Sequence, residues 1–165
     1  EEARAEAQYA VSLLKGYNVQ YPIAFDLERK ECMNAASRLN NMAMAKAFCE
    51  EIRAAGYIPA VYGSPSKLGG SPKTGQVNKD APFDYDGISS VYDIWLARYR
   101  WSSDVLDFSD AATRQTVYNK GYEGDEAKGE TYPNLPGVTM WQFTDKGRVA
   151  GVPGNVDLDL CYKVY

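Results

Sequence analysis

The sequence predicts an α/β protein in which helices alternate with parallel strands. Helical segments at residues 2–15 and 35–55 each precede a short apolar run, at residues 21–27 and 57–62. The helical segments carry apolar side chains at helical spacing, and the two runs have the length and aromatic content of buried strands. Because parallel strands need a long crossover, usually a helix, this order favours a parallel sheet.

Local signals mark where each of these elements ends. Residues 2–15 are rich in alanine, a strong helix former, and Gly16 follows them. Residues 35–55 are followed by Gly56, which suits the position just past a helix. The run at residues 57–62 stops at a Gly-Ser-Pro sequence that does not continue a strand.

The pattern weakens in the middle of the chain. Residues 64–87 are rich in Gly, Pro, Ser, Lys and Asp and predict an exposed loop. A third strand is expected at residues 94–99 and a short helix at residues 104–120. Residues 121–137 predict another loop, and loops of such length in a compact domain are usually functional or mobile.

The C-terminal part returns to strand patterns. Residues 138–144 predict a fourth strand, and residues 147–159 place Gly and Pro turns between short alternating runs, as in a hairpin. The sequence has 165 residues, which is enough to bury a real core. One domain over residues 1–165 is therefore expected.

Composition argues against several classes of function. Eighteen basic and 22 acidic residues give a net charge of −4, and no basic cluster is present, so a nucleic-acid partner is not expected. No apolar run approaches the roughly 20 residues of a membrane helix, so membrane insertion is not expected. No segment resembles a signal peptide. The first residue is Glu rather than Met, which leads us to expect a processed or truncated product.

The sequence contains no histidine. This absence excludes Ser-His and Cys-His catalysis and argues against a zinc site. The cysteines, Cys32, Cys49 and Cys161, lack metal-ligand spacing; inert thiols are expected, and a single disulfide stays open. No metal and no cofactor are predicted, so acid–base chemistry falls to carboxylates, Tyr, Lys or Cys.

Asp26 and Glu28 lie two residues apart where the first predicted strand ends. Side chains at this spacing share one face of a strand, and active sites of α/β folds form at the carboxyl ends of parallel strands. Two neighbouring carboxylates do not ionise independently, so one keeps its proton to higher pH, as glycosidic cleavage requires. The alternative is that both only form loop salt bridges with Arg29 and Lys30.

A second acidic pair, Asp157 and Asp159, has the same spacing near the C-terminus. Its alternative interpretation is turn chemistry after Gly154-Asn155. Aromatic side chains fall at or near the ends of the same predicted strands. They are Tyr62, Trp95, Tyr99 and Trp141. Flat rings bind sugars, although each one could equally pack in the core.

These segments together resemble the family-25 glycoside hydrolases. The strand YPIAFDLE is similar to the one that carries the DxE catalytic pair of that family, and the helix EARAEAQYA looks like the EA-rich helix before it. The segments AGYIPAVYGS and IWLARY are similar to the next strands. The C-terminal segment MWQFTDKGRVAGVPGNVDLDLCY resembles the WQ[FY]T…VDLN ending, the longest and most specific of these motifs.

The resemblance implies a fold and an activity. The fold is an irregular TIM-like β/α barrel, of which this chain holds the C-terminal part. The activity is that of a lysozyme, an N-acetylmuramidase that hydrolyses the β-1,4 bond between N-acetylmuramic acid and N-acetylglucosamine. The partners are then peptidoglycan glycan strands, and the protein is expected to be secreted and to act at the bacterial cell wall.

The resemblance also implies roles for single residues. Glu28 matches the general acid, and Asp26 matches the partner carboxylate that positions the substrate N-acetyl group or tunes Glu28. Asp157 matches the aspartate of the C-terminal motif and is expected among the catalytic groups. The expected substrate-binding residues are Tyr62, Trp95, Tyr99, Trp141, Gln142 and Asp159.

The sequence departs from the family pattern in three ways. The strands that open the family's barrel, including one that ends in a further catalytic Asp, are absent. They are expected on another chain, or are missing from this sequence, or the protein is atypical. Asp159 stands where the motif usually has Asn, and its charge is expected to raise the pKa of a neighbouring carboxyl. The stretch at residues 100–137 is longer than usual.

Two other functions stay open. A non-catalytic sugar-binding protein would keep the aromatic groove, but it has no need of both Asp26 and Glu28. A different hydrolase on a related barrel, such as a chitinase-like enzyme, is disfavoured by the C-terminal motif. A panel of substrates, together with a test of binding without turnover, separates the three.

Overall fold

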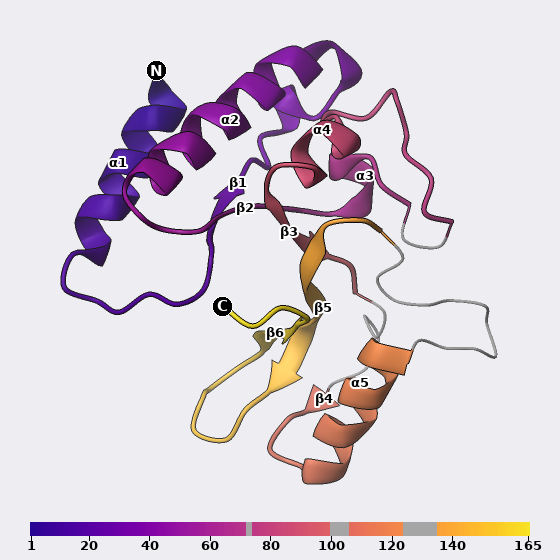
Figure 1. Ribbon diagram of the computed structural model, residues 1–165. Helices are drawn as coiled ribbons and strands as arrows, with labels where there is room; N and C mark the ends of the chain where they lie inside the picture. The colour runs from indigo at the N-terminus through magenta and orange to yellow at the C-terminus, as the bar shows by residue number, and fades with distance from the viewer. Residues whose placement is uncertain (72–73, 100–105, 124–134) are drawn as a thin grey trace.

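The computed structural model describes residues 1–71, 74–99, 106–123 and 135–165, and it confirms a mixed α/β fold with a parallel sheet (Figure 1). Within these residues the strands follow the order β1-β2-β3-β5-β4, and β6 pairs with β5. The strands are β1 (Ile23–Asp26), β2 (Pro59–Gly63), β3 (Asp93–Ala97), β4 (Leu106–Asp107), β5 (Val138–Arg148) and β6 (Val156–Cys161). All neighbours are parallel except β5 and β6, which are antiparallel.

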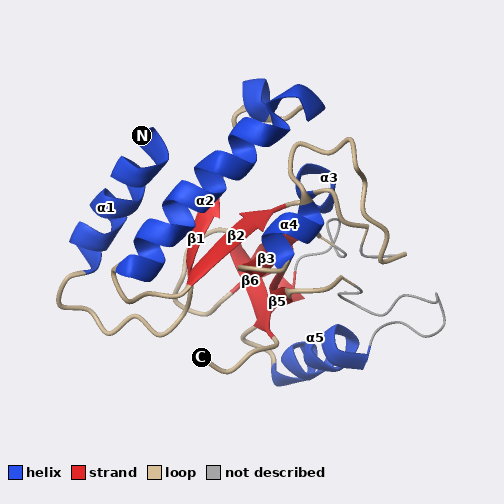
Figure 2. Cartoon of the chain, turned by 45° about the horizontal axis from the view of Figure 1, so that its top comes forward, coloured by secondary structure: helices blue, strands red, loops and turns tan. Residues whose placement is uncertain are grey.

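Helices cover one face of the first strands (Figure 2). They are α1 (Glu2–Leu14), α2 (Arg38–Ala54) and α4 (Tyr85–Ser89). The small residues Ala3 and Ala7 of α1 are buried, which lets this helix approach α2 closely. Phe48 of α2 packs on Phe25 of β1 with ring centroids 5.4 Å apart. The large apolar core therefore lies between these helices and the sheet.

A second, smaller core lies at the other end of the molecule, beneath α5 (Ala111–Glu123) (Figure 1). Trp141 and Phe143 of β5 meet edge to face there, with ring centroids 5.8 Å apart. Val117 of α5 and Leu158 of β6 complete this cluster. One face of the antiparallel β5–β6 pair thus packs against α5 and forms this second core.

Strand pairing places the ends of β1, β2 and β3 in register. Asp26 is paired with Tyr62, and Tyr62 is paired with Trp95. Residues paired across parallel strands point to the same face of a sheet. Their neighbours in the strands, Phe25 and Val61, belong to the large core instead. Asp26, Tyr62 and Trp95 therefore share the face of the sheet opposite to that core.

The region after β2 differs from the predicted loop. It contains a short helix α3 (Pro65–Leu68), and α4 begins at Tyr85, inside residues 64–87. Pro65 suits the first helical position because its fixed φ matches a helix, and Gly69 ends the turn with a φ of 89°. The loop prediction was wrong at these two short helices, because it was based on the Gly- and Pro-rich composition of the whole segment.

Other boundaries shift as well. Of the segment predicted as a helix at residues 104–120, residues 104–105 lie outside the described residues and Leu106–Asp107 form β4. The helix α5 starts at Ala111 and extends to Glu123, into the loop predicted at residues 121–137. Residues 124–134 of that predicted loop lie outside the described residues. The predicted strand at residues 138–144 continues to Arg148, and the predicted hairpin is present as the β5–β6 pair.

The last residues of the chain pack at the amino ends of β3 and β5. The hydroxyl of Tyr165 lies 3.0 Å from the Asp93 carboxylate at the start of β3 and 2.9 Å from Thr139 Oγ1 at the start of β5. Lys163 forms an ion pair with the same Asp93 at 2.9 Å. These contacts hold the last residues against the amino ends of two strands.

Among the described residues, no helix is both long and apolar enough to cross a membrane.

Candidate active site

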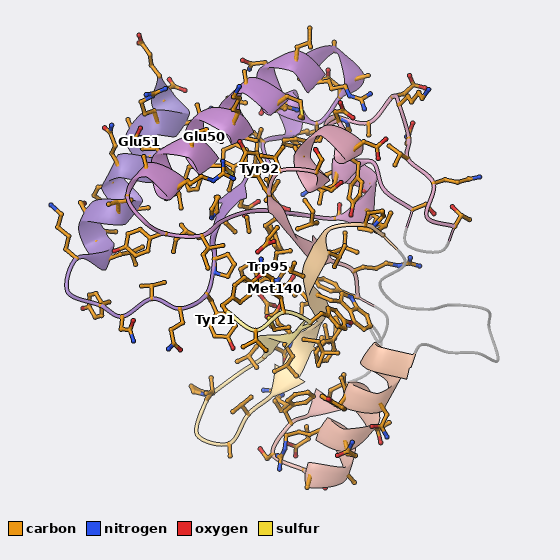
Figure 3. All side chains as sticks on the ribbon, in the orientation of Figure 1. Tyr21, Glu50, Glu51, Tyr92, Trp95 and Met140 are labelled. Carbon is orange, nitrogen blue, oxygen red and sulfur yellow. The ribbon has the colours of Figure 1, made fainter. Side chains whose placement is uncertain are left out.

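Asp26, Tyr62 and Trp95 form one row across three strands. Asp26 and Tyr62 lie at or next to the carboxyl ends of β1 and β2, and Trp95 lies in the middle of β3. Asp26 is exposed, whereas Tyr62 and Trp95 are half-buried and meet edge to face with ring centroids 5.3 Å apart. Trp95 lies near the middle of the sheet, beside Met140 of β5 (Figure 3). The row brings a carboxylate next to two aromatic rings, as the sequence predicted.

Gln142 joins the tyrosines of this site. The hydroxyls of Tyr62 and Tyr99 each donate a hydrogen bond to Gln142 Oε1, both at 2.9 Å. Gln142 is only 4% exposed. Its amide therefore orients the two tyrosine rings and is not accessible to a ligand. Desolvation raises the pKa of both tyrosines, and nearby carboxylates raise them further, so their hydroxyls stay protonated.

Asp159 accepts a hydrogen bond of 2.7 Å from the indole N–H of Trp95. Although Asp159 remains exposed on one side, desolvation of its carboxyl raises its pKa to about 6, and the charge of Asp157 adds to this. The indole N–H partly offsets the rise. Asp157 and Asp159 both lie in β6, as their spacing predicted.

Asp26, Glu28 and Lys67 form the charged part of the site. Desolvation raises the pKa of Asp26, the charge of Glu28 raises it further, and Lys67 lowers it. Glu28 forms an ion pair with Lys67 of α3, and not with its neighbours Arg29 or Lys30. Burial and the charge of Glu28 thus both oppose ionisation of Asp26.

Lys67 is a site residue that the sequence interpretation missed. It lies in the segment assigned to a loop, four residues after the end of β2. The signal was its place in the chain, because Ser64-Pro65 starts a helical turn immediately after a strand that ends in this site. A basic residue within that turn falls at the same edge of the sheet as the strand ends.

Trp141 does not lie where its predicted sugar-binding role requires. The residue is fully buried in the small core, and its indole N–H donates to the Arg98 carbonyl at 2.8 Å. Neighbouring residues of a strand point to opposite faces, so Gln142 and Trp141 cannot both face the site. The ring therefore has no free face for a sugar.

One hollow adjoins the charged residues, and a second is lined by none of Asp26, Glu28 and Lys67. One, of about 740 Å³, lies between the start of α1 and the end of β1 and includes Asp26 and Glu28. The other, of about 500 Å³, lies beyond α3, between Pro65 and Arg98. Both are large enough for one or more sugar rings or a short polar substituent.

Within the described residues, Cys32, Cys49 and Cys161 form no disulfide. Burial raises the pKa of the Cys49 thiol to about 12. Within the described part of the chain, no three His, Cys, Asp or Glu residues gather closely enough to hold a metal ion. Among the described residues, the site brings together carboxyls, tyrosine hydroxyls and the Lys67 ammonium.

Comparison of the chain with protein-family models, with curated proteins and with solved structures gave no match.

Proposed function

We propose that the chain is a carboxylate-dependent glycoside hydrolase of the N-acetylmuramidase type, which cleaves peptidoglycan. The observation that carries this proposal is the row of Asp26, Tyr62 and Trp95 across parallel strands, with Glu28 beside it. Asp26 and Tyr62 lie at or next to the carboxyl ends of their strands, where active sites of β/α folds form. The row lies within the segments that resemble family-25 glycoside hydrolases, which adds a specific substrate to the general chemistry.

The proposed roles follow from the chemistry of glycosidic cleavage. That reaction needs one carboxyl to protonate the leaving oxygen and a second to assist at the sugar carbon. Glu28 is the proposed proton donor, and Asp26 is its partner. Asp157 is a third carboxylate near Tyr99, whose pKa it raises. The rings of Tyr62, Trp95 and Tyr99 are the proposed sugar platform.

The fold and the place of action belong to the same proposal. The parallel strands β1, β2 and β3, with α2 between the first two, follow one another as strands and helices do in a β/α barrel, which supports the proposal of that fold. An irregular barrel of this kind is what the resemblance implies. A peptidoglycan substrate places the protein outside the cell that makes it, at a bacterial cell wall.

A second candidate is a wall-binding protein without turnover. The ion pair between Glu28 and Lys67 favours it, because the proposed proton donor is engaged by a cation. Such a protein would hold glycan strands on the same aromatic rings. It would release no product.

The two candidates are separated by the release of reducing ends from purified bacterial peptidoglycan. The wild type and Glu28→Gln are compared, since this change keeps the shape of the side chain and removes the transferable proton. A general acid contributes about 10²- to 10⁴-fold to a rate, so the variant is expected to lose at least about 100-fold. Chitin serves as the second substrate and reports a chitinase-like activity.

Glu31→Gln is the matched control, because Glu31 is an exposed carboxylate three residues further along the chain. It is expected to retain wild-type activity. Release of reducing ends by Glu28→Gln at the wild-type rate would overturn the assignment of the donor. Binding of peptidoglycan by the wild type with no release of reducing ends would favour the wall-binding protein.

A further inference from the structure

A buried asparagine of α2 joins two separate segments of the chain near the candidate site. Asn41 is 0% exposed, and its amide nitrogen Nδ2 donates hydrogen bonds to the Cys32 carbonyl at 2.8 Å and to the Pro82 carbonyl at 3.0 Å. Cys32 lies in the loop after β1, and Pro82 lies shortly before α4. One side chain therefore links these two segments.

The oxygen of the same amide shows that this side chain does more than fill space. Asn41 Oδ1 is buried and has no hydrogen-bond partner among the described residues. An unpaired buried acceptor destabilises a fold, and an apolar side chain of the same size would avoid that cost. The amide cannot be reversed, because its oxygen would then face two carbonyls and could accept from neither. Asn41 is therefore required as a donor of two hydrogen bonds.

The first partner of Asn41 belongs to the loop that carries Glu28. Cys32 lines the hollow that also includes Asp26 and Glu28. Between Glu28 and Cys32 the backbone forms a tight turn, in which the Cys32 N–H donates to the Arg29 carbonyl at 2.9 Å. The bond from Asn41 to Cys32 therefore anchors the turn next to Glu28.

The second partner is packed against the end of α3, the helix that carries Lys67. Ala81, the residue before Pro82, lies so close to Gly69 that a Cβ placed on Gly69 would be 2.7 Å from the Ala81 Cβ. Gly69 directly follows α3 and ends it. The bond from Asn41 to Pro82 thus supports the segment against which the end of this helix rests.

We propose that Asn41 is a positioning residue of the candidate site, which holds the loop of Glu28 and the helix of Lys67 at the separation where these two side chains meet. Their ion pair is 27% exposed on the Lys67 side and 53% exposed on the Glu28 side. Ion pairs this exposed are weak and do not hold two segments together by themselves. The inference rests on the proposed function for the role of Glu28 in catalysis.

The charge of Lys67 serves as a probe of its position. Desolvation and the charge of Glu28 raise the pKa of Asp26, and the charge of Lys67 lowers it. Lys67→Met is therefore expected to raise the pKa of Asp26 in the wild type. In an Asn41→Leu background, which lacks both N–H donors, the same change should raise it by less, because Lys67 is no longer held near the site.

Carbon-detected NMR titration of the Asp26 carboxyl measures the pKa in the wild type, in both single variants and in the double variant. The other charged residues that line the hollow are the same in these four proteins; they are Glu2, Glu6, Glu28 and Arg29. An equal rise in the two backgrounds would overturn the inference, as would the lack of a rise in the wild type.

Ile52→Val is the matched control, because Ile52 is a buried residue near the other end of the same helix. In this background Lys67→Met should keep its full effect on the pKa of Asp26. A general loss of stability is thereby separated from a loss of position.

The wild type offers a measurement that does not depend on the folding of any variant. Both Nδ2 protons of Asn41 are expected to exchange slowly with solvent, because they are buried and hydrogen-bonded. Those of the exposed neighbour Asn40 should exchange rapidly. Equally rapid exchange at Asn41 would contradict the two bonds and overturn the inference.

The proposed hydrolysis gives a further readout. Asn41→Leu is expected to lower kcat for the release of reducing ends by up to about 100-fold with little change in KM, since a displacement of about 1 Å can cost that much. The pKa and exchange measurements need no substrate. Positioning by Asn41 can therefore fail while hydrolysis stands, and the reverse.

Discussion

At the scale of single residues, the site depends on which polar groups share a partner. Gln142 offers one amide oxygen to two tyrosine hydroxyls. Asp159 takes the indole N–H of Trp95. These bonds orient three rings through their polar edges. Gln142 and Asp159, which the sequence predicted to bind substrate, thus hold the rings of the site in place.

Asp159→Asn is expected to change how stability depends on pH. The carboxyl of Asp159 has a pKa of about 6 in the fold against an ordinary value of 3.8, so the native state binds more protons than the unfolded state between these pH values. Stability of the wild type is therefore lost as pH rises from about 4 to 6. The variant lacks this loss and keeps an oxygen for the Trp95 N–H. It should be more stable than the wild type at pH 7 by about 1 kcal/mol, a discounted figure because Asp159 is partly exposed.

The measurement is urea unfolding of both proteins at several pH values. The difference in unfolding free energy should shrink towards zero below pH 4. Asp80→Asn, at an exposed aspartate outside the site, is the control and should show no such trend. A difference that is the same at every pH would contradict the pKa assigned to Asp159.

At the scale of elements, the β5–β6 pair depends on a close contact at Gly147. A Cβ placed on Gly147 would lie 2.4 Å from two carbons of the Leu158 side chain. Gly147 is paired with Val156, beside an irregularity in the register. A glycine is needed here because the Leu158 side chain fills the space that any larger residue would take.

Gly147→Ala is expected to destabilise the protein by about 1–3 kcal/mol, the usual cost of overpacking. Leu158→Ala alone should cost about 2–5 kcal/mol through the cavity that it leaves. The double variant should cost less than the sum, because the new methyl group then enters the cavity. Thermal or urea unfolding of the four proteins gives the coupling, and strict additivity would show that the two residues are not in contact.

Elements also show how far the sequence could predict this structure. The two long helices and the strands at Asp26 and Tyr62 were predictable, because periodicity and stop signals agreed there. The helix α3 was not, since one turn of four residues has too few positions to show a period. Lys67 was missed with it. The predicted sugar-binding role of Trp141 was wrong, because successive side chains of β5 point to opposite faces of the sheet and that of Trp141 points into the small core.

The candidate site was predictable only in part for a related reason. The DxE spacing pointed to Asp26 and Glu28 without any knowledge of their surroundings. The roles of Lys67 and Gln142 depend on contacts with residues 39 and 80 positions away in the chain, respectively. A local sequence pattern cannot indicate contacts between residues so far apart in the chain. The arrangement of the whole site depends on the register of the strands.

At the scale of the whole molecule, two cores of unequal size support different parts of the chain. The large core joins α1, α2 and α4 to the first three strands. The small core joins α5 to β5 and β6. Gln142 and Asp159 of the site lie on β5 and β6, which carry the small core, whereas Asp26 and Tyr62 lie on strands that the large core supports. The candidate site thus depends on two cores of different expected stability.

Amide hydrogen exchange is expected to report this division. Amides of α5 should exchange through an opening of lower free energy than amides of β2, because fewer buried side chains hold α5 in place. The measurement is native-state exchange over a series of low denaturant concentrations. Leu158→Ala should accelerate exchange in α5 more than in α2. A single opening free energy shared by α5 and β2 would contradict the division.

The row formed by Asp26, Tyr62 and Trp95 has a consequence for the quality of folding. Each member comes from a different strand, and a slip of one residue in any strand would turn its member towards the helices. A misaligned sheet could still be compact and rich in secondary structure, yet it would lack the row. Catalytic or sugar-binding activity would therefore measure the fraction of correctly aligned molecules in a refolded sample. Circular dichroism cannot measure this fraction, because a misaligned sheet has the same secondary-structure content.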